Sequence, residues 1–179
     1  MRLILAREAL DPHLKVAGDV LNTRLPKKKR IIAGIKAFGF YSKWYLKQWL
    51  PIYSKIPKDV HPVFKSKLRY VQKTSKRLAR TLFHAMVAYG PGLDKQQLLL
   101  ARIAEIGTEL FVITATVLRA NTKLGKDQQY IIDLANCIFT SSKYTIDNLF
   151  TDIKKNNDNK NYKLARNVLA KKYRHLEII

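Results

Sequence analysis

Two long stretches of the sequence carry apolar residues at alternating steps of four and three, which is the spacing of one face of an α-helix. The residues of the first stretch are Phe64, Leu68, Val71, Ser75, Leu78, Leu82, Ala85 and Tyr89. Those of the second are Leu99, Ile103, Ile106, Leu110, Ile113 and Val117. A stripe of this length needs another helix to cover it, so the spacing predicts a helical bundle in which the second stretch is the central helix.

Proline divides the first half of the chain into shorter pieces. All six prolines lie before residue 92, whereas the second half is free to form long helices. Asp11 followed by Pro12 predicts a helix start, because a carboxylate N-cap and a first-turn proline both favour one. The first half is therefore predicted to contain helices over residues 2–10 and 12–21, an exposed link over 22–30, and a helix over 31–50 that Pro51 ends.

The second half is predicted to form long helices joined by short turns. The turn Gly90-Pro91-Gly92 ends the helix that starts at His61-Pro62, and Asp94 with Gln97 has the spacing of a capping box for the next helix. Asp127 then caps a helix to about Lys155, whose apolar set is Ile131, Leu134, Ile138, Tyr144 or Thr145, and Leu149. A polar loop over 156–161 precedes a last helix marked by Leu164, Val168 and Tyr173.

The predicted fold class is all-α: an antiparallel helical bundle of long helices with a shorter helical, aromatic-rich N-terminal arm. Residues 60–155 supply the three longest helices, and a fourth is expected from the aromatic segment or the C-terminus. Few segments alternate apolar and polar residues as strands do. The single cysteine, Cys137, lies among apolar residues and is predicted to be a buried, inert thiol.

Positive charge dominates the sequence and gathers in one region. The net charge is +21, and 17 of the 34 lysines and arginines lie between Val20 and Leu93, where Asp59 is the one acid. Seven of the 18 aromatic residues, including both tryptophans, fall between Phe38 and Tyr53. Such a surface favours an anionic partner: a membrane, a nucleic acid or an acidic protein surface.

The ionisable residues provide no pattern for catalysis. The histidines, at His13, His61, His84 and His175, lack paired metal-ligand spacing, and each is predicted to be a surface or hydrogen-bonded residue. Glu105 and Glu109 have no Glu-x-x-His companion, so they are expected to form a polar face that pairs with Arg102 or Lys95. No phosphate-cradling glycine motif is present. We therefore predict no catalytic, metal or cofactor-binding residue in this chain.

Five segments of the sequence follow one another as in a known family of enzymes. They are Arg2 to Leu10, Gly39 to Trp49, Leu78 to Gly90, Lys95 to Ala104, and Gly107 to Phe111. Over roughly residues 1–121, they resemble the extra C-terminal helical domain of the bacterial-type and very-long-chain acyl-CoA dehydrogenases. Beyond Asn121 the resemblance is one of architecture only.

The resemblance implies a fragment of a larger enzyme. Residues 1–21 would end the core helices of the dehydrogenase, 22–59 would form a basic aromatic-rich linker and helix, and 60–179 a C-terminal helical bundle. Met1 stands just before the family's Arg-Leu pair, so the catalytic glutamate would lie upstream, together with the FAD-binding and acyl-binding parts. The complete enzyme would be an FAD-dependent oxidoreductase of fatty-acid β-oxidation, whereas this chain alone is predicted to bind no cofactor and to be inactive.

The expected partners follow from the same resemblance and from the charge. The first is the catalytic domain of the dehydrogenase, in the same chain or encoded separately. The second is an anionic membrane, because the very-long-chain members use this domain in membrane association. The membrane-surface candidates are Lys36, Phe40, Lys43, Trp44, Lys47 and Trp49. An open alternative is that these tryptophans pack on the catalytic domain.

Three further expectations complete the sequence analysis. Lys65, Arg69, Lys73, Lys76 and Arg80 are expected to form a solvated basic stripe on the helix that starts at Pro62. A rival function is that of an independent basic helical protein binding anionic membrane or nucleic acid, although no named nucleic-acid motif is present. The chain is expected to be intracellular, cytoplasmic or peripheral to a membrane, with no secretory signal and no transmembrane helix, and able to self-associate through an exposed apolar face.

Overall fold

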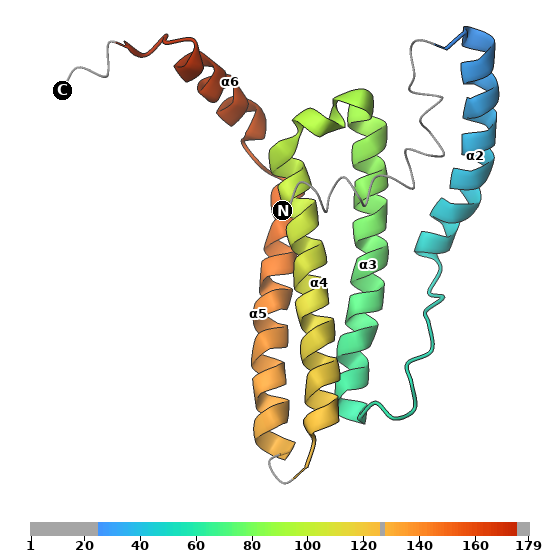
Figure 1. Cartoon of the computed structure of the whole chain (residues 1–179), viewed down its shortest axis with the longest axis vertical. Coiled ribbons are helices and arrows are strands. Elements are labelled where there is room, and N and C mark those ends of the chain that lie inside the picture. The colour runs from blue at the N-terminus through green and yellow to red at the C-terminus, as the bar shows by residue number, and fades with distance from the viewer. Residues whose placement is uncertain (1–24, 126–127, 175–179) are drawn as a thin grey trace.

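The computed structural model describes residues 25–125 and 128–174 (Figure 1). The predicted helices over 2–10 and 12–21 and the predicted cap at Asp127 lie outside these residues. The described part is helical and contains no strand, so the all-α prediction is confirmed. Its elements are α2 (Lys27–Trp49), α3 (Pro62–Tyr89), the 3₁₀-helix η1 (Gly90–Lys95), α4 (Gln97–Lys123), α5 (Gln128–Lys154) and α6 (Asp158–Leu169).

Three long helices, α3, α4 and α5, form the bundle, and in Figure 1 α4 lies between the other two. The whole four-three stripe predicted for α4, from Leu99 to Val117, is buried, which confirms α4 as the central helix. The main core is built around Phe64 of α3, Ile106 and Ile113 of α4, and Ile146 of α5, all of which are almost fully buried. This core holds the three helices in place.

The most deeply buried residues of α5 differ from those predicted, although the predicted Ile131 and Leu149 are partly buried against the core. Ile132, Ala135, Ile146 and Phe150 are buried, whereas the predicted Leu134 is exposed. Of the predicted alternatives Tyr144 or Thr145, Tyr144 is exposed and Thr145 is half-buried. Cys137 is exposed, so the prediction of a buried thiol is wrong. The buried face is shifted by about one residue. Two of the buried positions, Ala135 and Ser142, carry small side chains, which suit a face that packs closely on its neighbours.

The connection from α3 to α4 differs in detail from the prediction. Gly90 ends α3 at a positive φ of 49°, a conformation that glycine adopts readily. Asp94 then lies inside η1 and is not an N-cap; α4 follows Gln96 without a side-chain cap from its own sequence. The backbone N–H of Leu98 instead donates to the hydroxyl of Tyr162, at 3.0 Å. The predicted capping box is thus replaced by a contact from α6.

α6 begins earlier than predicted and is joined to α4 by an ion pair. Asp158, expected within a loop, is the first residue of the helix. Its carboxylate accepts two hydrogen bonds from the Arg102 guanidinium, at 2.5 and 2.9 Å, and these raise the pKa of Arg102. Arg102, predicted to pair along its own helix, thus connects α4 to α6.

Lys67 is buried inside the bundle, an unusual place for a lysine. Its ammonium donates to the carbonyl of Val63 at 3.3 Å and lies over the rings of Phe64 and Phe139, 5.9 and 5.4 Å from their centroids. Burial lowers the pKa of Lys67 from its ordinary value of 10.5. Because the folded chain then binds this proton less tightly than the unfolded chain, the charge weakens folding at neutral pH.

Lys67→Met is expected to raise the free energy of unfolding at pH 7 by about 1 kcal/mol, since methionine keeps the length and removes the buried charge. In the wild type, the cost of the charge fades as the pH rises from the folded pKa of Lys67 towards 10.5. The advantage of the variant should therefore shrink over that window. Urea unfolding at several pH values measures it, with exposed Lys65→Met as the control; a loss of stability at pH 7 would contradict the prediction.

Candidate functional site

The aromatic helix α2 packs along the outer side of α3, beyond the three-helix bundle (Figure 1). The ring of Phe83 on α3 receives three aromatic side chains of α2. The centroids of Tyr41, Trp44 and Tyr45 lie 5.1, 5.8 and 5.3 Å from that of Phe83. The Tyr45 hydroxyl also shares a hydrogen bond of 2.9 Å with Nε2 of His84. These contacts determine which side of α2 remains exposed.

The C-terminal end of α2 is held by two cations of α3. The Lys76 ammonium donates to the carbonyls of Lys47, Leu50 and Ile52, at 3.2, 2.8 and 2.6 Å. The Arg80 guanidinium donates to the carbonyl of Gln48. Carbonyls at the end of a helix have no partner within the helix, and cations there also interact favourably with the helix dipole.

This arrangement corrects the prediction of a wholly solvated basic stripe on α3. Lys65 and Lys73 are exposed as expected, but Lys76 and Arg80 are half-buried. Arg80 also lies 4.3 Å from the ring centroid of Trp49. The sequence did not show that Lys76 and Arg80 hold the end of α2, because the carbonyls they bind lie about 30 positions earlier in the chain. The one available signal was that the last carbonyls of α2 need hydrogen-bond donors from outside the helix.

The structure separates the six membrane-surface candidates. Lys36, Phe40, Lys43, Lys47 and Trp49 are exposed on α2, whereas Trp44 is half-buried against Phe83. The start of α2 also differs from the prediction. Lys27 to Arg30, expected in an exposed link, form the first helical turn. That turn extends the helix, and Lys29 joins the exposed lysines.

The exposed side of α2 combines a lysine row with large apolar side chains. Lys29, Lys36, Lys43 and Lys47 follow one another at steps of seven or four, which brings them onto one side of the helix. Beside them, Ile32, Leu46 and Trp49 are 55%, 64% and 61% exposed. The helix contains no acidic residue. We name this surface, made of these lysines with the exposed Ile31, Ile32, Phe40, Leu46, Trp49 and Leu50, the basic apolar face.

Other functional groups are sparse in the described part. Residues 25–125 and 128–174 contain no cluster of three histidine, cysteine, aspartate or glutamate residues that could hold a metal ion. His61 begins α3, where its Nδ1 accepts from the backbone N–H of Val63 at 3.4 Å, and His84 pairs with Tyr45. Both agree with the prediction of hydrogen-bonded histidines.

None of the helices described is long and apolar enough to cross a membrane.

Comparison with known proteins finds relatives of this chain among the curated proteins. The chain is 34% identical, over 182 aligned residues, to "Probable acyl-CoA dehydrogenase FadE10" of Mycobacterium tuberculosis, in two strains, and of Mycobacterium bovis. The alignment includes 99% of this chain. The chain is related to the acyl-CoA dehydrogenases. The resemblance predicted from the five sequence segments is thereby confirmed.

The relationship to the acyl-CoA dehydrogenases concerns only part of those proteins. The chain spans 28% of the length of each of these relatives. No protein-family model matches the chain, and no solved structure does. The activity, cofactor and partners of a complete acyl-CoA dehydrogenase are therefore matters of proposal for this chain.

Proposed function

We propose that this chain is the non-catalytic, helical C-terminal part of an FAD-dependent acyl-CoA dehydrogenase of fatty-acid β-oxidation. The observation that supports the proposal is the identity of 34% over nearly the whole chain. Its role would be structural: it packs on the catalytic domain and docks the enzyme on membrane. The test of the first part lies in the gene. Coding sequence for the Glu-Gly-Thr motif and a flavin-binding part next to this region supports it, and unrelated flanking sequence would contradict it.

The described residues do not fit FAD by themselves. A dinucleotide's phosphates are commonly bound by a glycine-rich turn between a strand and a helix, and the described part has no strand. A concave site among α3, α4 and α5 has a volume of about 270 Å³, which is small even for a compact organic ligand. The flavin would accordingly be held by another part of the dehydrogenase, and we assign no catalytic step to the residues of this chain.

The basic apolar face of α2 supports docking on an anionic membrane. Lysines attract anionic headgroups at about 1 kcal/mol each, and apolar and aromatic side chains beside them can enter the interface. Trp49, Leu46 and Ile32 supply apolar area on the same helix as Lys36, Lys43 and Lys47. Trp44 is half-buried against Phe83, whereas Trp49 stays largely exposed although Arg80 lies over its ring. We therefore assign membrane contact to Trp49 and not to Trp44.

Substituting Lys36, Lys43 and Lys47 by glutamine is expected to weaken binding to anionic vesicles about 100-fold, since three contributions of about 1 kcal/mol are lost. Co-sedimentation with vesicles of phosphatidylserine and phosphatidylcholine measures the change, and vesicles of phosphatidylcholine alone should bind little wild-type chain. High salt should also weaken binding.

A matched control separates a defined surface from general charge. Lys160, Lys163 and Lys172 are exposed at the C-terminal end of the described chain, so their triple glutamine variant has the same net charge as the first. It should retain most of the binding. Equal losses in both variants would contradict a docking face on α2. Tighter binding of the wild-type chain to DNA than to anionic vesicles would also contradict it and would favour the nucleic-acid alternative.

A further inference from the structure

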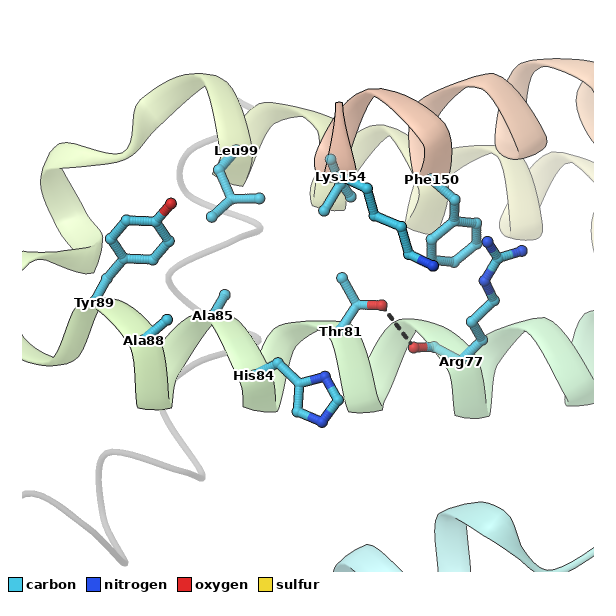
Figure 2. A pocket seen from close by; sticks show the side chains of 10 residues that line it. Arg77, Thr81, His84, Ala85, Ala88, Tyr89, Leu99, Phe150 and Lys154 are labelled. Atoms are coloured by element: carbon cyan, nitrogen blue, oxygen red, sulfur yellow. Dashed lines mark hydrogen bonds between the residues drawn. The ribbon is translucent and has the colours of Figure 1, made fainter. Parts of the chain in front are cut away.

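A small open pocket lies between α3, α4 and α5 (Figure 2). Its volume is about 270 Å³. Aliphatic side chains supply one part of its lining, with Ala85 and Ala88 from α3 and Leu99 from α4. Arg77 and Lys154 supply positive charge at the other end, where Figure 2 shows both beside the ring of Phe150. The pocket thus has an apolar end and a cationic end.

The two cations are placed differently. The Arg77 guanidinium carbon lies 3.7 Å from the centroid of the Phe150 ring, and that ring is almost fully buried. Stacking fixes the plane of the guanidinium while leaving its N–H groups available at the edge. Lys154 is exposed in the last turn of α5, and its long side chain reaches towards the same ring (Figure 2). One cation is therefore preorganised and the other is adjustable.

Neither cation has a carboxylate partner among the described residues. Asp152 lies two positions before Lys154 in the sequence, and no ion pair is formed between them. Asp147 pairs with Lys143 at 2.7 Å, and Asp158 of α6 pairs with Arg102. Two neighbouring positive charges that form no ion pair, beside an apolar wall that lowers the effective dielectric constant, attract an anion more strongly than isolated surface lysines do.

We propose that this pocket binds an anionic amphiphile: a carboxylate or phosphate monoester at the end of an aliphatic chain. The anion accepts hydrogen bonds from the Arg77 guanidinium and the Lys154 ammonium. The first carbons of the chain lie along Ala85, Ala88 and Leu99. The small volume admits the head group and a short length of chain, while the open side lets a longer chain leave the pocket. The ligand is either a free fatty-acid anion or a phosphorylated lipid, which share this chemistry.

Titration calorimetry of the full chain with octanoate and with octyl phosphate tests the proposal, and comparing the two distinguishes the carboxylate from the phosphate source. Lys154→Gln should lower the affinity for the tighter of the two ligands about ten-fold, because one charge-assisted hydrogen bond is lost. Ala88→Phe, at an exposed position of the lining, should abolish binding by filling the apolar end. Lys155→Gln, next to Lys154 and not part of the lining, is the matched control and should bind as the wild type does.

Several results would overturn the proposal. The folded wild-type chain could fail to bind either amphiphile. Octanol binding as tightly as octanoate would show that charge is not recognised, and inorganic phosphate binding as tightly as octyl phosphate would show that the apolar wall is not used. Equal weakening by Lys154→Gln and Lys155→Gln would indicate a general surface effect. Circular dichroism of each variant excludes unfolding as the cause.

Discussion

Phe64→Ala is expected to lower the free energy of unfolding by about 4 kcal/mol, the largest effect that we predict for a single substitution. Phe64 is fully buried, and the core around it includes Ile106 and Val117 of α4 and Ile146 of α5. Removing the ring opens a cavity shared by all three helices of the bundle. Domains are stable by about 5 to 15 kcal/mol, so this loss would be a large fraction of the total.

Urea unfolding followed by circular dichroism measures the effect of Phe64→Ala. Phe111→Ala is the control, because Phe111 is 72% exposed on α4 and its removal should change stability by less than about 0.5 kcal/mol. Similar losses for the two phenylalanines would contradict the core described here.

Phe83→Ala is expected to release α2 from α3 while α3, α4 and α5 stay folded. Three aromatic side chains of α2 pack on this one ring, so its loss removes their shared contact. Because Phe83 is only half-buried, we expect a loss of about 2 kcal/mol in the docking of α2, or roughly thirty-fold. Both tryptophans belong to α2, so tryptophan emission should shift to longer wavelength as Trp44 becomes hydrated.

The matched control for Phe83→Ala is Phe40→Ala, on the exposed side of α2. Phe40 is exposed and makes an edge-to-face contact with Tyr41, so its removal should leave the tryptophan emission almost unchanged. If Phe83→Ala changed neither the tryptophan emission nor the urea concentration at which α2 unfolds, the Phe83 ring would not be what holds α2. The Phe64→Ala variant should keep the wild-type tryptophan emission in the absence of urea. Phe64 lies in the core of α3, α4 and α5, whereas α2 packs on Phe83.

Hydrophobic spacing predicted the helices and the central position of α4 because both depend on local pattern. Every member of the predicted α4 stripe is buried. On α5 the same reasoning was right only in part, because Ile131 and Leu149 pack against the core but Leu134 is exposed. Apolar residues occupy neighbouring positions there, as with Ile131 and Ile132, so two adjacent faces look equally apolar. The packing of Ala135 against the neighbouring helices selects between them, and a single helix carries no information about that packing.

The candidate site was predicted in composition but not in orientation. Trp44 and Trp49 have similar neighbours in sequence, yet one packs on Phe83 and the other is 61% exposed. Lys76 and Lys73 are similarly alike in sequence, yet only Lys76 reaches the carbonyls at the end of α2. In both pairs, the direction of the side chain follows from how α2 lies against α3. The pairing of Arg77 with Phe150, on which the pocket depends, joins residues of two different helices and has no signature in either.

By itself, the sequence determined the all-α class, the positions of the long helices, the excess of positive charge and the relationship to the acyl-CoA dehydrogenases. These are properties of single segments, since propensity, period and charge are set by neighbours along the chain. The tertiary structure decided which face of α5 is buried, which tryptophan is the more exposed, and which basic residues stabilise helix ends. Those outcomes depend on contacts between residues far apart in sequence, where a rotation of one helix by one residue exchanges buried and exposed side chains.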